Sequence, residues 1–207
     1  MNKKDWTGNG NSIYKTLGAS NHTYKEREEN DFYATDPIAI DKLLTVEQPY
    51  KRVYECACGE GHLAKRLLEK SCIKELYASD IVDRGYGFIQ DFLQMKEDET
   101  SWIKDCDIIT NPPYKYAKEF VLHALDLVGY GHKVYMFLKL TFLEGKSRYK
   151  ELFSKYPPQK IYVFSERVMC AKNGRFDEMK AGGGSAVAYA WFVWQKGWKG
   201  KTIVEWI

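Results

Sequence analysis

Short apolar runs alternate with amphipathic stretches over most of the chain. The apolar runs predict buried β-strands at residues 52–56, 76–79, 107–110, 134–138, 161–164 and 187–194. Helical spacing of apolar residues predicts helices at residues 37–44, 62–69, 116–128 and 147–153. Strands that alternate with helices form a mostly parallel sheet with helices on both faces, and this burial accounts for strands that are apolar throughout. We therefore predict an α/β fold with right-handed crossovers.

Both ends of the chain and one internal segment depart from this pattern. Residues 1–30 are polar and lack periodicity, so we expect an N-terminal arm that precedes a single domain of residues 31–207. Residues 165–186 are polar and rich in glycine, and they lie between the last two predicted strands. After residue 194 the chain continues as a tail of glycine and lysine.

Composition and charge narrow the class of protein. No apolar run approaches the roughly 20 residues that span a bilayer, and the N-terminus lacks the apolar core of a signal peptide, so we expect a cytoplasmic protein with no membrane partner. The five cysteines are odd in number and lie mostly in apolar segments, which predicts reduced, buried thiols. Cys56 and Cys58 lack zinc-ligand spacing, and we expect no metal. The net charge of +3 permits a nucleic-acid partner without arguing for one.

The segment from Thr110 to Tyr114 follows one of the predicted strands and reads Thr-Asn-Pro-Pro-Tyr. Two prolines end the strand, and the first restricts Asn111 to an extended conformation. The amide oxygen of Asn111 and the carbonyl of Pro112 can both accept hydrogen bonds from an –NH2 group. The ring of Tyr114 can stack on a planar group. A tight turn without a chemical role is an equally good interpretation of this segment alone.

Other residues of chemical interest also lie at the carboxyl ends of predicted strands, where ligands bind in parallel α/β sheets. Gly59 and Gly61 mark a sharp turn from strand to helix and allow a ligand to approach the backbone closely. Carboxylates at Glu55 and Glu60 would repel a pyrophosphate and favour a ligand with an amino group and a sulfonium. Asp80 ends the next strand, where an acidic residue typically accepts from ribose hydroxyls. The alternatives are a plain turn at the glycines and a role as a helix cap or turn residue for Asp80.

Together these residues resemble the S-adenosylmethionine-dependent amino-methyltransferases, and among them the compact, phage-type DNA adenine-N6 methyltransferases. The resemblance covers residues 31–195. Its motifs, in chain order, are Phe32-Tyr33-Ala34-Thr35-Asp36-Pro37, Glu55-Cys56-Ala57-Cys58-Gly59-Glu60-Gly61, Asp80, Asp91-Phe92 and Asn111-Pro112-Pro113-Tyr114. The glycine motif departs from the family in its two cysteines, and no separate target-recognition domain is evident. The resemblance implies a Rossmann-like class I methyltransferase fold, with a seven-stranded, mostly parallel sheet and one antiparallel C-terminal strand.

The resemblance also implies roles for individual residues. The first motif would hold the amino-acid end of the cofactor, Asp80 its ribose and Asp91 the amine of its adenine. The implied cofactor-binding residues are Tyr33, Thr35, Pro37, Glu55, Ala57, Gly59, Gly61, Asp80, Ile81, Asp91, Phe92 and Asn111, and the implied catalytic residues are Asn111, Pro112, Pro113 and Tyr114. The cofactor would be S-adenosylmethionine, the product S-adenosylhomocysteine and the substrate DNA, and no obligate protein partner is implied.

The implied reaction is methylation of the exocyclic N6 amine of adenine in DNA. Asn111 and Pro112 would draw the amine hydrogens toward tetrahedral geometry, and positioning would supply most of the rate. The base must first be flipped out of the duplex. Three alternatives stay open: methylation of adenine in RNA, methylation of a protein glutamine amide, and a non-catalytic nucleic-acid-binding protein with this fold. Glutamine methyltransferases usually carry a helical N-terminal domain, for which the expected arm is too short.

Residues 165–186 are the candidate segment for holding nucleic acid. Arg167, Lys172 and Arg175 would contact phosphates, and Phe176 would stack on the flipped base opposite Tyr114. Three successive glycines at residues 182–184 would let the segment close over the substrate. A surface loop with incidental charge is an equally good interpretation.

Overall fold

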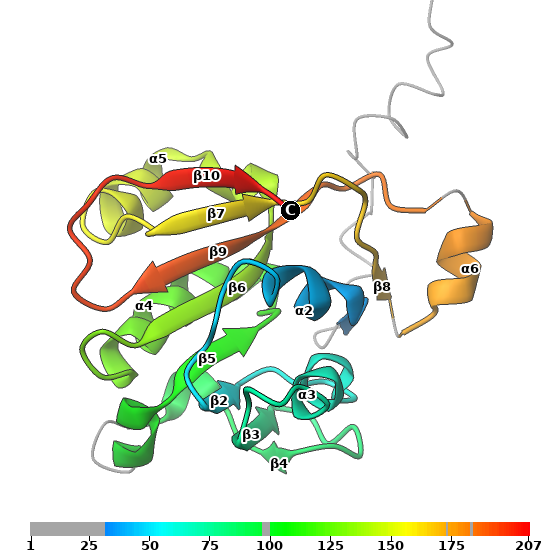
Figure 1. Ribbon diagram of the computed structural model, residues 1–207, viewed down its shortest axis with the longest axis horizontal. Helices are drawn as coiled ribbons and strands as arrows, with labels where there is room; N and C mark the ends of the chain where they lie inside the picture. Colours follow the sequence, from blue (N-terminus) through cyan, green and yellow to red (C-terminus); the bar gives the residue numbers. More distant parts are fainter. Residues whose placement is uncertain (1–31, 97–99, 173, 183) are drawn as a thin grey trace, which may run out of the picture.

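An eight-stranded sheet runs through the middle of the protein (Figure 1). The structure is a computed structural model and describes residues 32–96, 100–172, 174–182 and 184–207, so the arm expected over residues 1–30 lies outside it. The strand order is β10-β7-β9-β6-β5-β2-β3-β4. In chain order the strands are β2 Arg52–Glu55, β3 Glu75–Asp80, β4 Phe88–Ile89, β5 Asp107–Thr110, β6 Lys133–Lys139, β7 Lys160–Val163, β9 Tyr189–Gln195 and β10 Ile203–Trp206. β9 is antiparallel to both of its neighbours, and the other pairs are parallel.

The fold class predicted from the sequence is confirmed, but the sheet has eight strands instead of seven. The antiparallel strand is not the C-terminal one, because β9 is followed by β10, which pairs in parallel with β7. β10 falls in the stretch that we expected to be a glycine and lysine tail. Its apolar side chains Ile203, Val204 and Trp206 are exposed, so this short run has no buried face from which a strand could be predicted.

Helices cover both faces of the sheet. α2 (Ile38–Leu43) and α3 (His62–Leu68) lie on the face toward the viewer in Figure 1, and α4 (Ala117–Leu127) and α5 (Lys146–Arg148) lie on the other. α5 continues directly into the π-helical turn η6 (Tyr149–Phe153). The remaining short helices are η1 Phe92–Gln94, η3 Ser101–Asp105, η4 Tyr114–Tyr116, η5 Leu140–Leu143 and α6 Phe176–Ala181. Within the described ranges, no helix is long and apolar enough to cross a membrane.

β9 shows why the central strands are apolar throughout. Trp191 and Val193 belong to the core that includes α2 and α3, whereas Phe192 and Trp194 belong to the core that includes α4. Successive side chains of a strand point to opposite faces, so a strand with a core on each side needs an apolar residue at every position. The Nε1 of Trp191 donates to the main-chain oxygen of Ala39 (2.9 Å), which ties α2 to the sheet.

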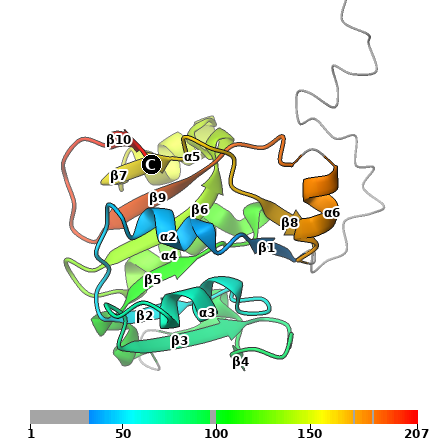
Figure 2. The ribbon, with the colours of Figure 1, turned by 45° about the vertical axis from the view of Figure 1, so that its right-hand side comes forward.

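A separate two-stranded ribbon lies beyond the carboxyl ends of the parallel strands (Figure 2). Its antiparallel strands are β1 (Tyr33–Thr35) and β8 (Cys170–Lys172), with Thr35 opposite Cys170 and Tyr33 opposite Lys172. Residues 165–186, for which we expected only a polar, glycine-rich segment between two strands, supply β8 and α6, and both project from the end of the sheet (Figure 1). The sequence could not indicate this, because a three-residue strand with a partner far earlier in the chain has no local periodicity.

Candidate active site

The corner after β5 packs against the β1–β8 ribbon. The Nδ2 of Asn111 donates to the main-chain oxygen of Tyr33 (3.0 Å) and lies 3.5 Å from the Sγ of Cys170. Because a carbonyl oxygen can only accept, the contact with Tyr33 defines which side of the carboxamide is Nδ2. The Oδ1 is buried and has no hydrogen-bond partner among the described residues. Of the prolines that follow, Pro112 is buried and Pro113 is exposed.

The unpartnered Oδ1 of Asn111 indicates a ligand. A buried acceptor without a donor costs about 1–3 kcal/mol, and native proteins leave few such atoms without a reason. The two donors of the same carboxamide are directed at the ribbon, so the side chain presents one free group, and that group is an acceptor. A ligand with an –NH2 group would complete it.

Tyr114 is held by aromatic and polar neighbours at the same corner. Its ring centroid lies 6.1 Å from that of Tyr189, in a stacked arrangement, and 6.5 Å from that of Tyr33. The Nζ of Lys139 lies 4.8 Å from the ring centroid, and the hydroxyl lies 3.3 Å from the Sγ of Cys170. Burial raises the pKa of the Tyr114 hydroxyl well above its usual value, so the phenol is neutral.

The glycine loop between β2 and α3 has the backbone that its sequence predicts. Gly59 and Gly61 have φ values of 54° and 79°, a region that favours glycine. A Cβ on Gly59 would lie 1.9 Å from the ring of Phe32, and a Cβ on Gly61 would lie 2.5 Å from the ring of Tyr86. Two aromatic rings therefore cover the loop, and a ligand that contacts its backbone must share this space with them.

Asp80 holds the glycine loop at the end of β3. Its Oδ2 accepts from the backbone nitrogen of Gly59 (2.8 Å), and its Oδ1 accepts from the backbone nitrogen of Val82 (3.0 Å). Each carboxylate oxygen has a second lone pair, and the residue is half-buried. The turn role that the sequence left open is therefore present, and it leaves Asp80 with acceptor capacity for a ligand.

Glu55 ends β2 beneath the glycine loop, and only 2 % of it is exposed. Burial raises the pKa of its carboxyl well above the usual value, a hydrogen bond with the backbone of Ala64 opposes this, and the Asp80 carboxylate adds to it. Its Oε2 has no partner among the described residues. A cation bound beside this carboxyl would favour its charged form, so Glu55 can pair with an amino group.

The residues implied for the adenine end of a cofactor differ in their surroundings. The Oδ1 of Asp91 accepts from the backbone nitrogen of Leu93 (3.0 Å) and caps η1. Ile81, directly after β3, is 58 % exposed, whereas Phe92 is 2 % exposed and its ring centroid lies 5.1 Å from that of Phe120 in the core. In this arrangement the ring of Phe92 would support a cofactor site by holding η1 and Asp91 in place.

The other implied cofactor residues lie on the same elements. Tyr33 and Thr35 are the ends of β1, and Pro37 directly precedes α2. Ala57 is the second residue after β2 and is half-buried. The Oδ1 of Asp36 accepts from the backbone nitrogen of Ile38 (3.1 Å), the first residue of α2.

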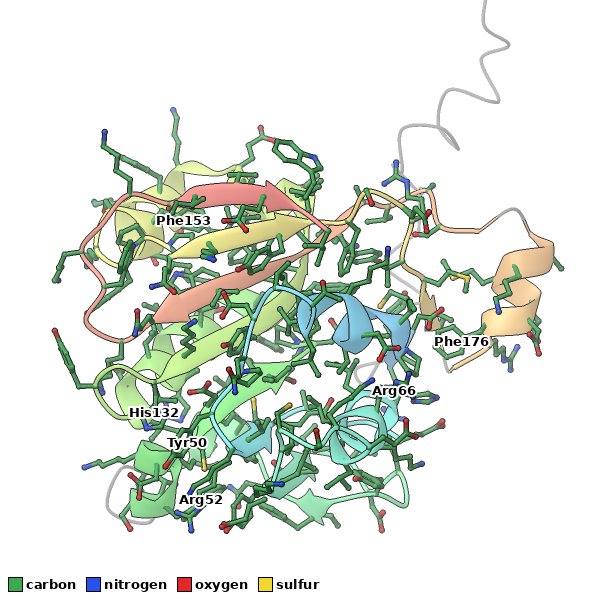
Figure 3. The ribbon with its side chains drawn as sticks, viewed as in Figure 1. Tyr50, Arg52, Arg66, His132, Phe153 and Phe176 are labelled. Carbon is green, nitrogen blue, oxygen red and sulfur yellow. The ribbon has the colours of Figure 1, made fainter. Side chains whose placement is uncertain are left out.

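Besides Tyr114, the residues proposed to contact nucleic acid lie in β8 or within a few residues of it. Arg167 and Lys172 are exposed, and the Nη1 of Arg175 lies 3.6 Å from Oε2 of Glu178. The ring centroid of Phe176 lies 5.7 Å from that of His62, the first residue of α3, which places Phe176 beside the glycine loop (Figure 3). Stacking of Phe176 opposite Tyr114 across a base stays a prediction.

A shallow hollow at the other end of the sheet has a different character. Figure 3 shows Tyr50 and His132, which line it, at the opposite end of the molecule from Phe176. Asp107 accepts there from the backbone nitrogens of Tyr50 (2.8 Å) and Lys133 (2.9 Å) and lies 3.0 Å from Nδ1 of His132. Both carboxylate oxygens are thus occupied by the fold, in contrast to Glu55. In the described parts of the chain, no cluster of three or more His, Cys, Asp and Glu could hold a metal ion.

Several neighbours of the candidate active site were not selected from the sequence. Tyr86, Lys139 and Tyr189 belong to segments without a motif, and only the tertiary structure brings them to the site. Phe32 stood in the first motif, which was the available signal. Cys170 was predicted only as a reduced, buried thiol; this is confirmed for Cys170 and for the other cysteines except Cys72, which is free but half-buried.

The sequence matches no family model and no curated protein, but solved structures resemble the fold. A chain described as the modification subunit of a type I restriction enzyme from Vibrio vulnificus YJ016 has a TM-score of 0.55 and 15 % identity over 92 % of this chain and 49 % of that chain. A chain described as a class I S-adenosylmethionine-dependent methyltransferase from Listeria monocytogenes has a TM-score of 0.50 and 12 % identity, and the match covers 83 % of this chain and 62 % of that chain. A chain described as an RNA methyltransferase from Pyrococcus horikoshii has a TM-score of 0.52 and 15 % identity, and the match covers 77 % of this chain and 81 % of that chain.

The protein thus spans about half the length of the Vibrio vulnificus chain and less than two thirds of the Listeria monocytogenes chain. At these identities the likeness concerns the fold, and a fold does not by itself define an activity. The fold and the site nevertheless agree on position, because ligands of such sheets bind beyond the carboxyl ends of the strands. The protein therefore has the Rossmann-like fold of class I S-adenosylmethionine-dependent methyltransferases, with its candidate active site at the ends of β2, β3 and β5.

Proposed function

We propose that the protein transfers a methyl group from S-adenosylmethionine to the exocyclic N6 amine of adenine in DNA. The observation that carries the proposal is the carboxamide of Asn111. Its Nδ2 is engaged by Tyr33, and its buried Oδ1 has no partner among the described residues. An exocyclic amine would supply the missing donor, and the neighbouring ring of Tyr114 belongs to the residue type on which bases stack.

The residues at the ends of β2 and β3 fit the cofactor. Glu55 would pair through Oε2 with its ammonium group, and Asp80 would accept from its ribose hydroxyls with the lone pairs that the glycine loop leaves free. Gly59 and Gly61 would let it approach the backbone. When bound, S-adenosylmethionine supplies the methyl group, whose bond to sulfur breaks as the bond to the amine nitrogen forms.

The corner would prepare the amine for attack. An exocyclic amine is a poor nucleophile because its lone pair is delocalised into the ring. The Oδ1 of Asn111 and the carbonyl of Pro112 would each accept one of its hydrogens, which draws the nitrogen toward tetrahedral geometry and localises the lone pair. The nitrogen loses one proton to solvent after transfer. Positioning supplies most of the rate, and no histidine or cysteine needs to act as a base.

The choice of nucleic acid rests on charge near the site. An amide acceptor suits the amine of adenine and the amide of a protein glutamine equally. Lys172 is the last residue of β8, in the ribbon that contacts Asn111, and Arg167 and Arg175 each lie three residues from that strand. Cations in this place would bind phosphates. They favour a nucleic acid over a glutamine side chain, and we propose DNA, and not RNA, because of the resemblance carried by the five motifs.

Methyl transfer with labelled cofactor tests the proposal. The purified protein is incubated separately with duplex DNA, single-stranded DNA, RNA and a glutamine-containing protein, and the nucleic acids are digested and their nucleosides separated. We expect N6-methyldeoxyadenosine from DNA with the wild type and none with Asn111→Ala. Label in RNA alone or in protein alone would show that the substrate is not DNA. Label in none of the four substrates would overturn the proposal.

A further inference from the structure

We infer that Cys170 is a positioning residue that holds the carboxamide of Asn111 and the hydroxyl of Tyr114 in their working orientations. The inference rests on the proposed function of the corner and adds to it a residue of β8, far from the motif in the sequence. Three contacts of one sulfur atom, described next, carry it.

The Sγ of Cys170 lies at the centre of a small polar cluster. It is 3.3 Å from the hydroxyl of Tyr114, 3.5 Å from Nδ2 of Asn111 and 3.8 Å from the main-chain oxygen of Tyr33. A thiol is both a weak donor and a weak acceptor. In one consistent arrangement, Nδ2 donates to Tyr33 and to the sulfur, the phenol donates to the sulfur, and the thiol donates to Tyr33. Every hydrogen of the cluster then has an acceptor.

This arrangement determines what Asn111 offers to a substrate. Both amide hydrogens are used within the protein, so rotation of the carboxamide by 180° would break two contacts and set Oδ1 against the carbonyl oxygen of Tyr33. Oδ1 therefore stays the free group. Without the sulfur, one amide hydrogen and the phenol of Tyr114 would lose this partner, and a single contact with Tyr33 would orient the amide.

The ribbon explains why the sulfur is in this place. Cys170 is paired with Thr35 across the β1–β8 ribbon, and it is 3 % exposed. Burial raises the pKa of its thiol above the usual value, so the group keeps its hydrogen at neutral pH. The contact with Asn111 is therefore between neutral groups and depends on geometry alone.

Cys106 is the matched control. It is also a fully buried cysteine, and its Sγ contacts a main-chain oxygen, that of Trp102 (3.4 Å), in the core and not at the corner. Replacing either cysteine with alanine removes a buried sulfur and lowers stability through the same loss of packing. Only Cys170→Ala removes a contact of Asn111, so a difference in catalysis between the two variants reports positioning.

Kinetics of methyl transfer to DNA form the first arm of the test. We expect Cys170→Ala to lower kcat by about tenfold to a hundredfold, because small misplacements of catalytic groups have effects of this size, with the cofactor Kd and the DNA KM nearly unchanged. Cys170→Ser, which still donates and accepts, should recover most of kcat, and Cys106→Ala should leave it unchanged. A wild-type kcat in Cys170→Ala, or an equal loss in Cys106→Ala, would overturn the inference.

The second arm does not depend on activity. The side-chain amide of Asn111 gives an NMR signal that can be identified by its absence in Asn111→Ala, and its hydrogens should exchange with water at least about tenfold faster in Cys170→Ala than in the wild type or Cys106→Ala. If this is observed while the wild type methylates no substrate, the proposed function fails and the positioning stands. Unchanged exchange in Cys170→Ala would refute the positioning whatever the wild type methylates.

Discussion

The Nδ2 of Asn111 donates to the main-chain oxygen of Tyr33 over 3.0 Å, although the two residues are 78 positions apart in the chain. Tyr33 belongs to the motif implied to hold the cofactor, and Asn111 to the motif implied to hold the substrate amine. One hydrogen bond thus joins the two halves of the candidate site. The amide that faces the substrate is oriented by the strand that would face the cofactor.

Asn111→Ala is expected to abolish methyl transfer while leaving cofactor binding largely intact. The amide oxygen would act mainly on the substrate amine, and loss of one catalytic hydrogen-bonding group typically costs about 10²- to 10³-fold in kcat. Single-turnover methylation measures the first effect, and calorimetric titration with S-adenosylmethionine measures the second. Transfer at the wild-type rate would show that the assigned mechanism is wrong.

Asp80→Ala is expected to weaken S-adenosylmethionine binding strongly. The change removes a proposed ribose acceptor and the acceptor for Gly59, and hydrogen bonds to a charged group contribute about 1.5–3 kcal/mol each, so Kd should rise at least about tenfold. Asp83→Ala is the control, because Asp83 is exposed and accepts, among the described residues, from the nearby backbone of Gly85 (2.9 Å). Equal titration curves for both variants would remove Asp80 from the cofactor site.

Replacing Arg167, Lys172 and Arg175 together with glutamine is expected to weaken binding to duplex DNA and to flatten its salt dependence. If all three meet phosphates, the slope of log K against log salt should fall by about 3, while cofactor affinity stays the same. Binding isotherms at several salt concentrations measure the slope.

The control for this triple variant carries the same change of charge elsewhere. Exposed Lys51 and Lys74 lie at the starts of β2 and β3, at the opposite ends of these strands from the site, and exposed Lys199 lies in the turn before β10. Glutamine at these three positions should leave the slope close to that of the wild type. If both triple variants lower the slope equally, residues 165–186 have no special role in binding nucleic acid.

Glu47 is expected to stabilise the fold in a pH-dependent way. It is 7 % exposed, and it accepts from Nζ of Lys133 (2.6 Å) and from the hydroxyls of Tyr162 (2.6 Å) and Tyr135 (3.2 Å). Burial alone would raise the pKa of Glu47, but the hydrogen bonds from Lys133 and Tyr162 outweigh it and hold the pKa below its usual value. Glu47→Ala should lower the free energy of unfolding at pH 7 by about 3–5 kcal/mol, as for other broken buried pairs.

The sign of the pH effect follows from the lowered pKa. A carboxylate with a lower pKa in the folded state contributes stability above its unfolded pKa, near 4.3, and loses it as the pH falls through the folded value. In urea unfolding, the difference in free energy of unfolding between the wild type and Glu47→Gln should therefore be largest at pH 7 and should shrink below about pH 4. Glu69→Gln, which breaks an exposed pair with Arg66, should change stability by less than about 1 kcal/mol. A difference that grows in acid would contradict the assignment.

The sequence by itself determined the fold class, most of its elements and the strand ends at which the candidate site is proposed. Apolar runs and helical spacing are local signals, and they located strands such as β2 and β6 and helices such as α3 and α4 within a few residues. The glycine turn at Gly59 and the proline corner at Asn111 are local as well, because a positive φ and an X-Pro restriction act on single residues. Parallel topology then brought these strand ends to the same edge of the sheet.

Only the tertiary structure decided which groups at that edge are free and which are engaged. Segments from distant parts of the chain meet in three places: the pairing of Thr35 with Cys170, the contact of Phe176 with His62, and the edge strand β10. Such pairings leave no periodicity within either segment. The unpartnered Oδ1 of Asn111 has the same origin, since the residue type supplies a donor and an acceptor, and the arrival of β1 and β8 decides that the donor is used and the acceptor is free.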